Sequence, residues 1–295
     1  MYATLVPSPT VPPHSLPPAA AATYAATLTW ESYANGAYQC STIEKELTLR
    51  KWRSANGYAA ELCTKLPRLT KQEDLQDLEQ VALRLARLYE QVVVQTTPTG
   101  EIIALLNHEA LAETWARLAR ELRAATTADD QVTATLLAFL ERQVQHPASL
   151  LQSLANDYLY QTLLLGYGEL QPGQPVAHPR PRAFANFFDK QTLFFTEEVV
   201  ATPGEVAGQL QVELRGLLDA QKTTVPAIEA LIGQALRAAA GAAPLPAELP
   251  PPSFAYQATY TLDQATGLPV HIALTVWVRV GQLYNKEYNL LINRL

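Results

Sequence analysis

The stretch Val270-His-Ile-Ala-Leu-Thr-Val-Trp-Val-Arg-Val280 carries an aliphatic side chain at every second position. A period of two is the pattern of a β-strand with one buried face and one solvated face. The same parity recurs in Tyr284–Ile292, and another strand pattern, Tyr256–Leu262, precedes the turn that leads into Val270. The C-terminal segment is therefore predicted to form an antiparallel meander of three strands.

The N-terminal part of the chain repeats this strand pattern. Apolar side chains alternate with polar ones from Tyr24 to Trp30, and further strands are predicted around Tyr38–Trp52 and Tyr58–Leu66. Asn56-Gly57 lies between the last two, and this dipeptide favours a tight hairpin because both residues tolerate positive φ. A second meander is therefore predicted near the N-terminus.

Between the two meanders the hydrophobic period becomes that of helices. One predicted helix follows a capping residue, Thr70, and places its apolar side chains three and four residues apart. These apolar positions are Leu75, Leu78, Ala82, Leu85, Tyr89 and Val92. Asn107 is predicted to cap the next helix, which contains Trp115. Pro147 is predicted to open an apolar helix that continues through Tyr158.

These patterns predict an α+β fold. The antiparallel sheet would be built from the N- and C-terminal strand meanders, with a central helical segment, residues 107–166, packed on one face. Residues 1–22 are rich in proline and are predicted to form an N-terminal arm, and residues 23–295 a single domain. Because prolines also cluster in residues 172–181, two subdomains, 23–170 and 183–295, are the alternative.

Composition limits the function classes. The chain has 22 Lys and Arg against 28 Asp and Glu, a formal charge of −6, which argues against nucleic-acid binding because that requires a basic surface. No apolar run is long enough to span a bilayer, and residues 1–18 lack the features of a secretory signal. We therefore expect a cytoplasmic protein. Cys40 and Cys63 are expected to be free thiols, although a single bridge is conceivable.

Motifs of catalysis are missing from the sequence. It contains no phosphate-binding glycine loop, no GxSxG elbow and no HExxH pair. His108 with Glu109 and Glu113 is a candidate metal or general-base site, but acidic residues in a first helical turn are also explained by the helix dipole. Asp157 is a second candidate, and a structural role is favoured for it too. We expect no enzymatic activity, no cofactor and no metal.

Aromatic residues form a candidate binding site for a hydrophobic small molecule or lipid. Such a ligand would lie between a curved sheet and its helices. The pocket would be lined by Phe187, Phe188, Phe194, Phe195 and Trp277. The competing interpretation is that these side chains simply fill the core.

Several segments resemble a group of uncharacterised bacterial α+β proteins of unknown function. That group has an N-terminal strand meander and a hairpin of the form VxVxxxGxIxxxN, to which Val92–Asn107 corresponds with longer spacings. A helix containing Trp115, a leucine-rich helix at Leu150–Tyr158 and the pair Tyr167-Gly168 continue the resemblance. The resemblance implies a fold and no active site.

The turn Tyr260–Pro269 has the pattern YxLDxxTGLP, which is also found in bacterial curved-sheet proteins, including carriers of hydrophobic ligands. We read it as a structural hairpin, because Asp263 can bond backbone amides two residues on and Gly267 can close the turn.

The function predicted from sequence is that of a non-catalytic protein-interaction or assembly protein. It would be a structural subunit or adaptor of a larger bacterial complex, for example of the contractile-injection or phage-tail type. The expected partner is another protein or further copies of the chain, because tyrosines are abundant and the C-terminal strand could pair with another chain. The hydrophobic-ligand carrier is the alternative.

Overall fold

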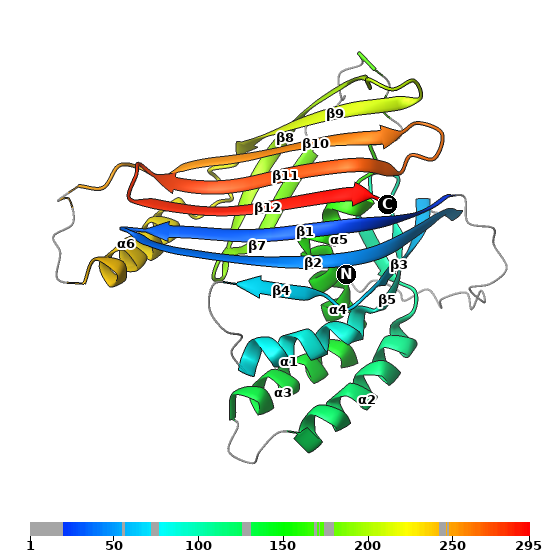
Figure 1. Cartoon of the computed structure of the whole chain (residues 1–295), viewed down its shortest axis with the longest axis horizontal. Helices are drawn as coiled ribbons and strands as arrows, with labels where there is room; N and C mark the ends of the chain where they lie inside the picture. Colours follow the sequence, from blue (N-terminus) through cyan, green and yellow to red (C-terminus); the bar gives the residue numbers. More distant parts are fainter. Residues whose placement is uncertain are drawn as a thin grey trace, which may run out of the picture.

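The alternating segments of the sequence become strands of one large antiparallel sheet (Figure 1). The structure is a computed structural model, which describes residues 20–54, 57–71, 77–125, 131–167, 170, 172–173, 180–241, 246 and 248–295. In these residues twelve strands form the sheet, in the order β6-β5-β3-β2-β1-β12-β11-β10-β9-β8-β7, with β4 paired to β2. The strands are β1 (Ala20–Ala34), β2 (Ala37–Ser54), β3 (Gly57–Thr64), β4 (Arg68–Lys71), β5 (Gln91–Thr96), β6 (Ile102–Leu105), β7 (Arg180–Phe188), β8 (Gln191–Pro203), β9 (Gln209–Leu218), β10 (Ser253–Asp263), β11 (Pro269–Val280) and β12 (Tyr284–Arg294).

The first and last strands lie side by side in the middle of the sheet. β1 pairs with β12 in antiparallel register from Tyr24 opposite Arg294 to Ala34 opposite Tyr284. This pairing joins the two meanders through their backbones. Of the predicted arm, residues 1–19 lie outside the described residues, and Ala20–Ala22 already belong to β1.

The sheet curls, so that β7 lies behind β1 and β2 (Figure 1). The ring of Phe187 at the end of β7 contacts the ring of Trp30 in β1, with centroids 5.5 Å apart. We call the enclosed side of the sheet the inner face. It carries the large buried side chains of the main core, including Tyr24, Tyr256 and Tyr288.

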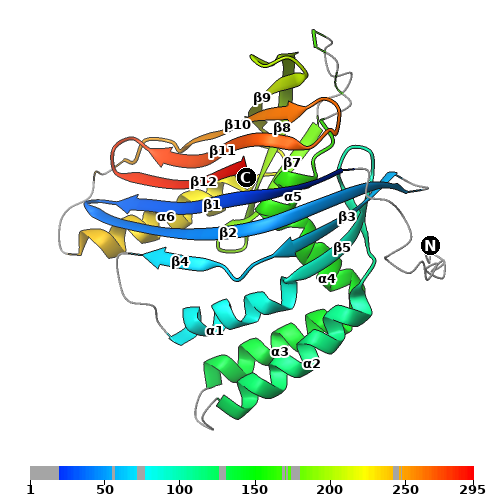
Figure 2. The ribbon, with the colours of Figure 1, turned by 45° about the vertical axis from the view of Figure 1, so that its right-hand side comes forward.

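The helices form two groups. They are α1 (Asp77–Leu85), the 3₁₀ helix η1 (Ala86–Tyr89), α2 (His108–Ala125), α3 (Gln131–Gln145), α4 (Pro147–Ala155), α5 (Tyr158–Leu164) and α6 (Val225–Ala240). α1, η1, α2 and α3 lie beyond one edge of the sheet and share a small core with Leu150 of α4 (Figures 1 and 2). α5 and α6 pack on the inner face and contribute Tyr158 and Ile232 to the main core.

The predicted fold class, α+β with a central helical segment on one face, is therefore wrong. The sheet dominates the molecule, and most of residues 107–166 form a small core of their own instead of covering the sheet. The periodicity identified individual strands, but β5, β6 and β7–β9 extend the same sheet on both sides of the two meanders. The periodicity of a segment reports which of its faces is buried and does not identify the distant strand with which it pairs.

Two predicted helix ends are wrong for local reasons. The helix predicted through Val92 gives way to η1, and Val92 is buried in β5 opposite Leu62 of β3. Thr70 does not cap a helix, because it belongs to β4 and pairs with Thr42. An apolar residue at helical spacing fits a strand equally well when the chain turns back onto a sheet.

The roles of two side chains at helix ends also differ from the prediction. Asn107 precedes α2 as predicted, and its carbonyl accepts the Leu111 N–H. Its side-chain amide bonds β5 instead: Oδ1 accepts the Val93 N–H at 2.9 Å and Nδ2 donates to the Gln91 carbonyl. The helix predicted to run from Pro147 through Tyr158 is two helices. Asp157 separates them and caps α5, accepting the N–H of Leu159 at 2.9 Å.

The two cysteines are unpaired. Cys40 lies in β2 opposite Glu31 of β1, and Cys63 lies in β3 opposite Thr48 of β2. The expectation of free thiols is confirmed.

Candidate functional site

One face of the sheet has none of the described helices over it. The described helices lie on the inner face or beyond the sheet edge, and the strands β2, β1, β12, β11, β10 and β9 present their other side to solvent (Figures 1 and 2). We call this side the open face. Strand register aligns its side chains in rows, for example Thr29, Asn289 and Thr275 across β1, β12 and β11.

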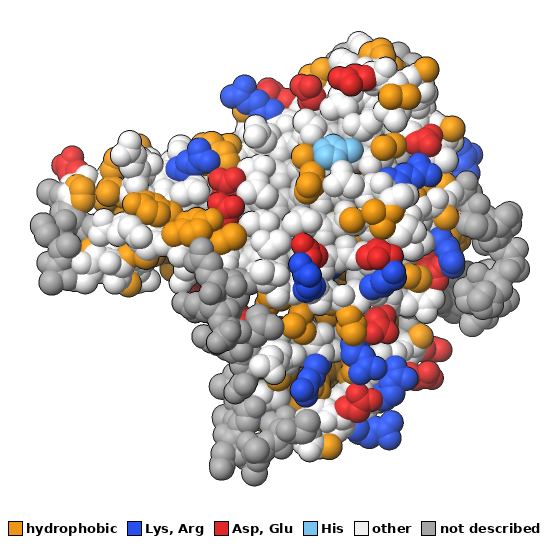
Figure 3. Space-filling view, viewed as in Figure 1, with side chains coloured by type: hydrophobic (Ala, Val, Ile, Leu, Met, Phe, Trp, Pro, Cys, Tyr) orange, Lys and Arg blue, Asp and Glu red, His pale blue; other side chains and the backbone are white. Residues whose placement is uncertain are grey.

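The middle of the open face carries no Asp, Glu, Lys or Arg. Three successive rows across β1, β12, β11 and β10 make up this uncharged centre. Its residues are Ala25, Thr27, Thr29, Gln257, Thr259, Thr261, His271, Ala273, Thr275, Asn289, Leu291 and Asn293. In Figure 3 this part of the surface is largely white, and charged side chains surround it.

Hydrogen bonds between neighbouring strands order the polar side chains of the uncharged centre. The Thr275 hydroxyl donates to Oδ1 of Asn289 at 2.7 Å. Nδ1 of His271 lies 2.8 Å from Oδ1 of Asn293. Each of these groups keeps further donor or acceptor capacity that faces solvent. The surface is therefore ordered and able to hydrogen-bond without charge.

Leu291 is the largest apolar side chain of the uncharged centre. Its side chain is 42 % exposed, and it lies opposite Ala273 of β11 and Thr27 of β1. Exposure of a large aliphatic side chain to water is unfavourable. A partner surface that covered Leu291 would remove this cost.

Ion pairs lie around this centre. Arg279 donates to Glu287 at 3.0 Å and stacks over the ring of Trp277, 4.4 Å from its centroid. On the far side, beyond β1, Glu44 pairs with Arg68 at 3.0 Å. Each such surface pair is worth about 1 kcal/mol or less. The open face therefore has an uncharged middle and a charged rim.

The predicted aromatic site is divided between the two faces. Phe187, Phe188 and Phe195 are buried on the inner face, and Phe187 contacts Phe188 with ring centroids 5.5 Å apart. Phe194 and Trp277 alternate with buried neighbours and lie on the opposite face. The five side chains therefore do not line one pocket. Strand parity at Trp277, which follows the buried Val276, could have shown this from sequence.

The inner-face phenylalanines are core residues in close ring contact. Phe195 packs against Tyr256 at 5.7 Å, and Lys286 places its ammonium 4.9 Å from the Phe188 centroid. Burial lowers the pKa of Lys286, and the neighbouring Asp189 opposes this shift. Aromatic rings that contact one another in this way fill the space that a ligand would need.

We predict that Phe187→Ala lowers the free energy of unfolding by about 3 kcal/mol, because it leaves a cavity beside Trp30. Trp277→Ala serves as the matched control on the opposite face, with an expected loss of about 1 kcal/mol or less. Urea denaturation of both variants measures the difference. Equal losses would contradict the assignment of the two rings to different faces.

A second notable group of side chains is buried on the inner face. Glu197 of β8 is 3 % exposed, and its two carboxylate oxygens each accept a hydrogen bond at 2.8 Å, from the hydroxyls of Tyr167 and Tyr256. The pKa of both phenols is raised well above the ordinary value. Burial is the larger cause, and the negative charge of Glu197 is the second. We call these residues, with Arg182, Thr162 and Tyr260, the Glu197 cluster.

Arg182 supplies the positive charge of the Glu197 cluster. It is 6 % exposed and donates from Nη2 to the Thr162 hydroxyl of α5 at 3.0 Å. Burial acts to lower the pKa of Arg182, but Tyr256, Tyr260 and Glu197 raise it further than burial lowers it. The cluster therefore ties α5 to strands β7, β8 and β10 from within the core.

Sequence reasoning missed Glu197, although a signal was present. Leu193, Phe195 and Glu197 share one parity in β8, and the first two are large apolar residues. A carboxylate at a position that faces the core predicts a hydrogen-bonding or charged partner there, because burying an unpaired charge is costly.

Two other residues considered from sequence, His108 and Asp157, have structural roles. Nε2 of His108 lies 2.7 Å from the Val144 carbonyl and so joins α2 to the end of α3. Asp157 caps α5. The described residues contain no grouping of three or more Cys, His, Asp or Glu side chains placed to hold a metal ion.

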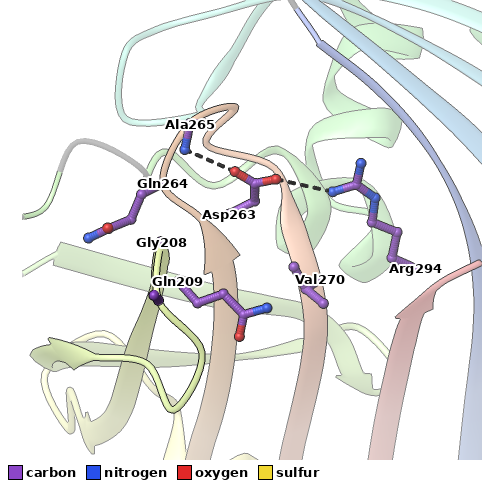
Figure 4. A pocket seen from close by; sticks show the side chains of 8 residues that line it. Gly208, Gln209, Asp263, Gln264, Ala265, Val270 and Arg294 are labelled. Atoms are coloured by element: carbon purple, nitrogen blue, oxygen red, sulfur yellow. Dashed lines mark hydrogen bonds and ion pairs between the residues drawn. The ribbon is translucent and has the colours of Figure 1, made fainter.

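The hairpin between β10 and β11 borders a pocket of about 750 Å³. Asp263 points toward Arg294 and accepts from it at 3.4 Å, while its other oxygen accepts the Ala265 N–H at 2.9 Å (Figure 4). The Gln264 N–H donates to the Gly208 carbonyl, which joins this hairpin to the β8–β9 hairpin. The predicted bond from a backbone amide two residues on to Asp263 is thus confirmed, and the two hairpins are joined by the separate Gln264–Gly208 bond.

No helix among the described residues combines the length and the apolar character needed to cross a bilayer.

Comparisons with known proteins identify no family. The sequence matches no protein-family profile and no curated protein. Among solved structures, the chain is similar to one described as "lipid-protein interactions in lipovitellin", with a TM-score of 0.45 and 9 % sequence identity. The similarity covers 95 % of this chain and 25 % of the lipovitellin chain, so the chain spans about a quarter of that protein's length. A likeness this distant assigns neither a family nor a ligand.

Proposed function

We propose that this chain is a non-catalytic protein that acts by binding another protein through its open face, as a subunit or adaptor of an assembly. The observation that carries the proposal is the uncharged centre inside a charged rim that includes the ion pair Arg279–Glu287. Charged residues are depleted at the core of protein interfaces and kept at their rims. Covering such a surface with a partner costs little free energy, because few charged groups are removed from water.

Two titratable groups, Glu197 and His108, support a role without chemistry. The Glu197 carboxylate has its hydrogen bonds inside the core, and His108 is bonded to a helix carbonyl. A catalytic group must reach its substrate at hydrogen-bonding distance, and these groups instead contact other parts of the fold.

Site-specific photo-crosslinking tests the proposal. A crosslinking side chain is introduced at Leu291 on the open face or, as a matched control, at Phe139 on α3; the native side chains are 42 % and 49 % exposed. We expect irradiation of the native cells to give discrete protein adducts from position 291 and none of the same mass from position 139. Adducts that are absent from both positions, or identical at both, would refute the proposal.

A further inference from the structure

We infer that the protein bound by the open face is a second copy of this chain, packed face to face about a two-fold axis. The inference rests on the function proposed above and adds the identity of the partner. In a two-fold interface the same patch meets itself, so the patch must be complementary to its own copy. Three properties of the open face satisfy this condition.

The first property is the chemistry of its polar groups. Hydroxyl and amide side chains both donate and accept hydrogen bonds, so Thr275, Gln257 and Asn289 can each pair with an identical group. A carboxylate or an ammonium cannot do so, because it would face its own charge. The uncharged centre can therefore pack against a copy of itself without bringing like charges together or leaving its polar groups without hydrogen-bond partners.

The second property is charge. The chain carries a formal charge of −6, so two copies repel one another where acidic surfaces meet. Contact through the uncharged centre brings no like charges together at its middle, and part of the rim charge is already held in ion pairs, as in Arg279 with Glu287. A two-fold axis lying in the contact plane over Leu291 also places this exposed side chain against its counterpart, which removes both from water.

The third property is size. The open face spans six strands, from β2 to β9, and five aligned rows, from Tyr33 at one end to Ala25 at the other. With strands about 4.8 Å apart and rows about 6.8 Å apart, it measures roughly 29 by 34 Å, or about 1000 Å². A stable interface buries about 800 Å² from each partner, so the face is large enough for a dimer.

Sedimentation velocity of the purified full chain tests this inference. We expect a species of about 65 kDa, twice the 32.4 kDa of one chain, at micromolar concentration. Leu291→Arg and Thr275→Arg each place two like charges at the contact and are expected to raise the dimer dissociation constant about 100-fold or more. Phe139→Arg, an equally exposed site on α3, is expected to leave it unchanged. Circular dichroism confirms that each variant is folded.

The outcomes separate this inference from the proposed function. A wild-type chain that sediments at 32.4 kDa at every concentration overturns the second copy as partner. If crosslinks from position 291 then have masses that two copies do not explain, the proposed function stands with a different partner. A dimer that survives both arginine substitutions also overturns the inference, because the contact would lie elsewhere.

Discussion

Glu197→Ala is expected to lower the free energy of unfolding by about 4–5 kcal/mol. The substitution leaves the buried hydroxyls of Tyr167 and Tyr256 without their acceptor. It also removes the carboxylate that balances the buried charge of Arg182. Breaking one member of a buried charged group costs more than the group contributes, because the remaining polar atoms stay out of water.

Glu198→Ala is the matched control for this prediction. Glu198 is the next residue of β8, and it is exposed on the other face of the strand. Its replacement is expected to change the free energy of unfolding by about 0.5 kcal/mol or less. Glu197→Gln keeps one acceptor for the two phenols and is expected to fall between the two. Urea denaturation of the three variants checks the order, and losses at 197 and 198 that agree within 1 kcal/mol would contradict the account of the Glu197 cluster.

The second large effect is unfolding in mild alkali. Among the residues that the structure describes, eight tyrosines are buried, and burial is the main cause that raises the pKa of each phenol. They are Tyr24, Tyr158, Tyr160, Tyr167, Tyr256, Tyr260, Tyr284 and Tyr288. For Tyr284 the raised pKa is about 12. In the unfolded chain these phenols ionise near pH 10.

The sign of the effect follows from proton binding. Below pH 10 the phenols are protonated in both states, and the stability of the fold is fully present. Above pH 10 the unfolded chain loses these protons while the folded chain keeps them, so each tyrosine lowers the stability by about 1.4 kcal/mol per pH unit. Eight tyrosines together remove about 11 kcal/mol per unit, which is comparable to the whole stability of a domain.

One group acts in the opposite direction. Burial lowers the pKa of Lys286 in the folded state, so its contribution to stability rises as pH increases through the window below the ordinary lysine value of 10.5. A single lysine offsets at most about 1.4 kcal/mol per pH unit, which is small against eight tyrosines.

We therefore expect cooperative unfolding between about pH 10.5 and 11.5. Circular dichroism and the ultraviolet absorbance of the tyrosinate ion, recorded on the same samples, are expected to change together in one step. A gradual increase in tyrosinate centred near pH 10, with the circular dichroism of the sheet unchanged, would show that the phenols are accessible in the folded chain.

The sequence predicted individual strands better than their assembly. The parity of Ile272, Leu274 and Val276 is confirmed by their burial in β11, and the alternation that begins at Tyr24 is confirmed by the burial of Tyr24 and Ala26 in β1. Both predictions rest on local periodicity, which burial of one face imposes directly. The extent of the sheet rests on pairing between segments far apart in sequence, and this is why the predicted fold class was wrong.

The candidate site shows the same division. That Thr275 and Asn289 face solvent follows from their place between buried residues of their strands. That they lie opposite one another, and that the described helices leave this face open, depends on the pairing of β11 with β12 and on where the helices pack. The five aromatic residues proposed from sequence were grouped by residue type, and strand parity separates Trp277 from Phe187.

Covalent footprinting of His271 tests most directly whether the open face is the contact surface. His271 lies in the uncharged centre, and His146, an exposed residue at the start of α4, is the internal control. Both are modified with diethyl pyrocarbonate over a range of protein concentrations, and the rates are measured by mass spectrometry. We expect modification of His271 to slow as the chain assembles while the rate at His146 stays constant. Assembly that leaves the rate at His271 unchanged, or that slows both residues equally, would contradict the assignment of the open face as the binding surface.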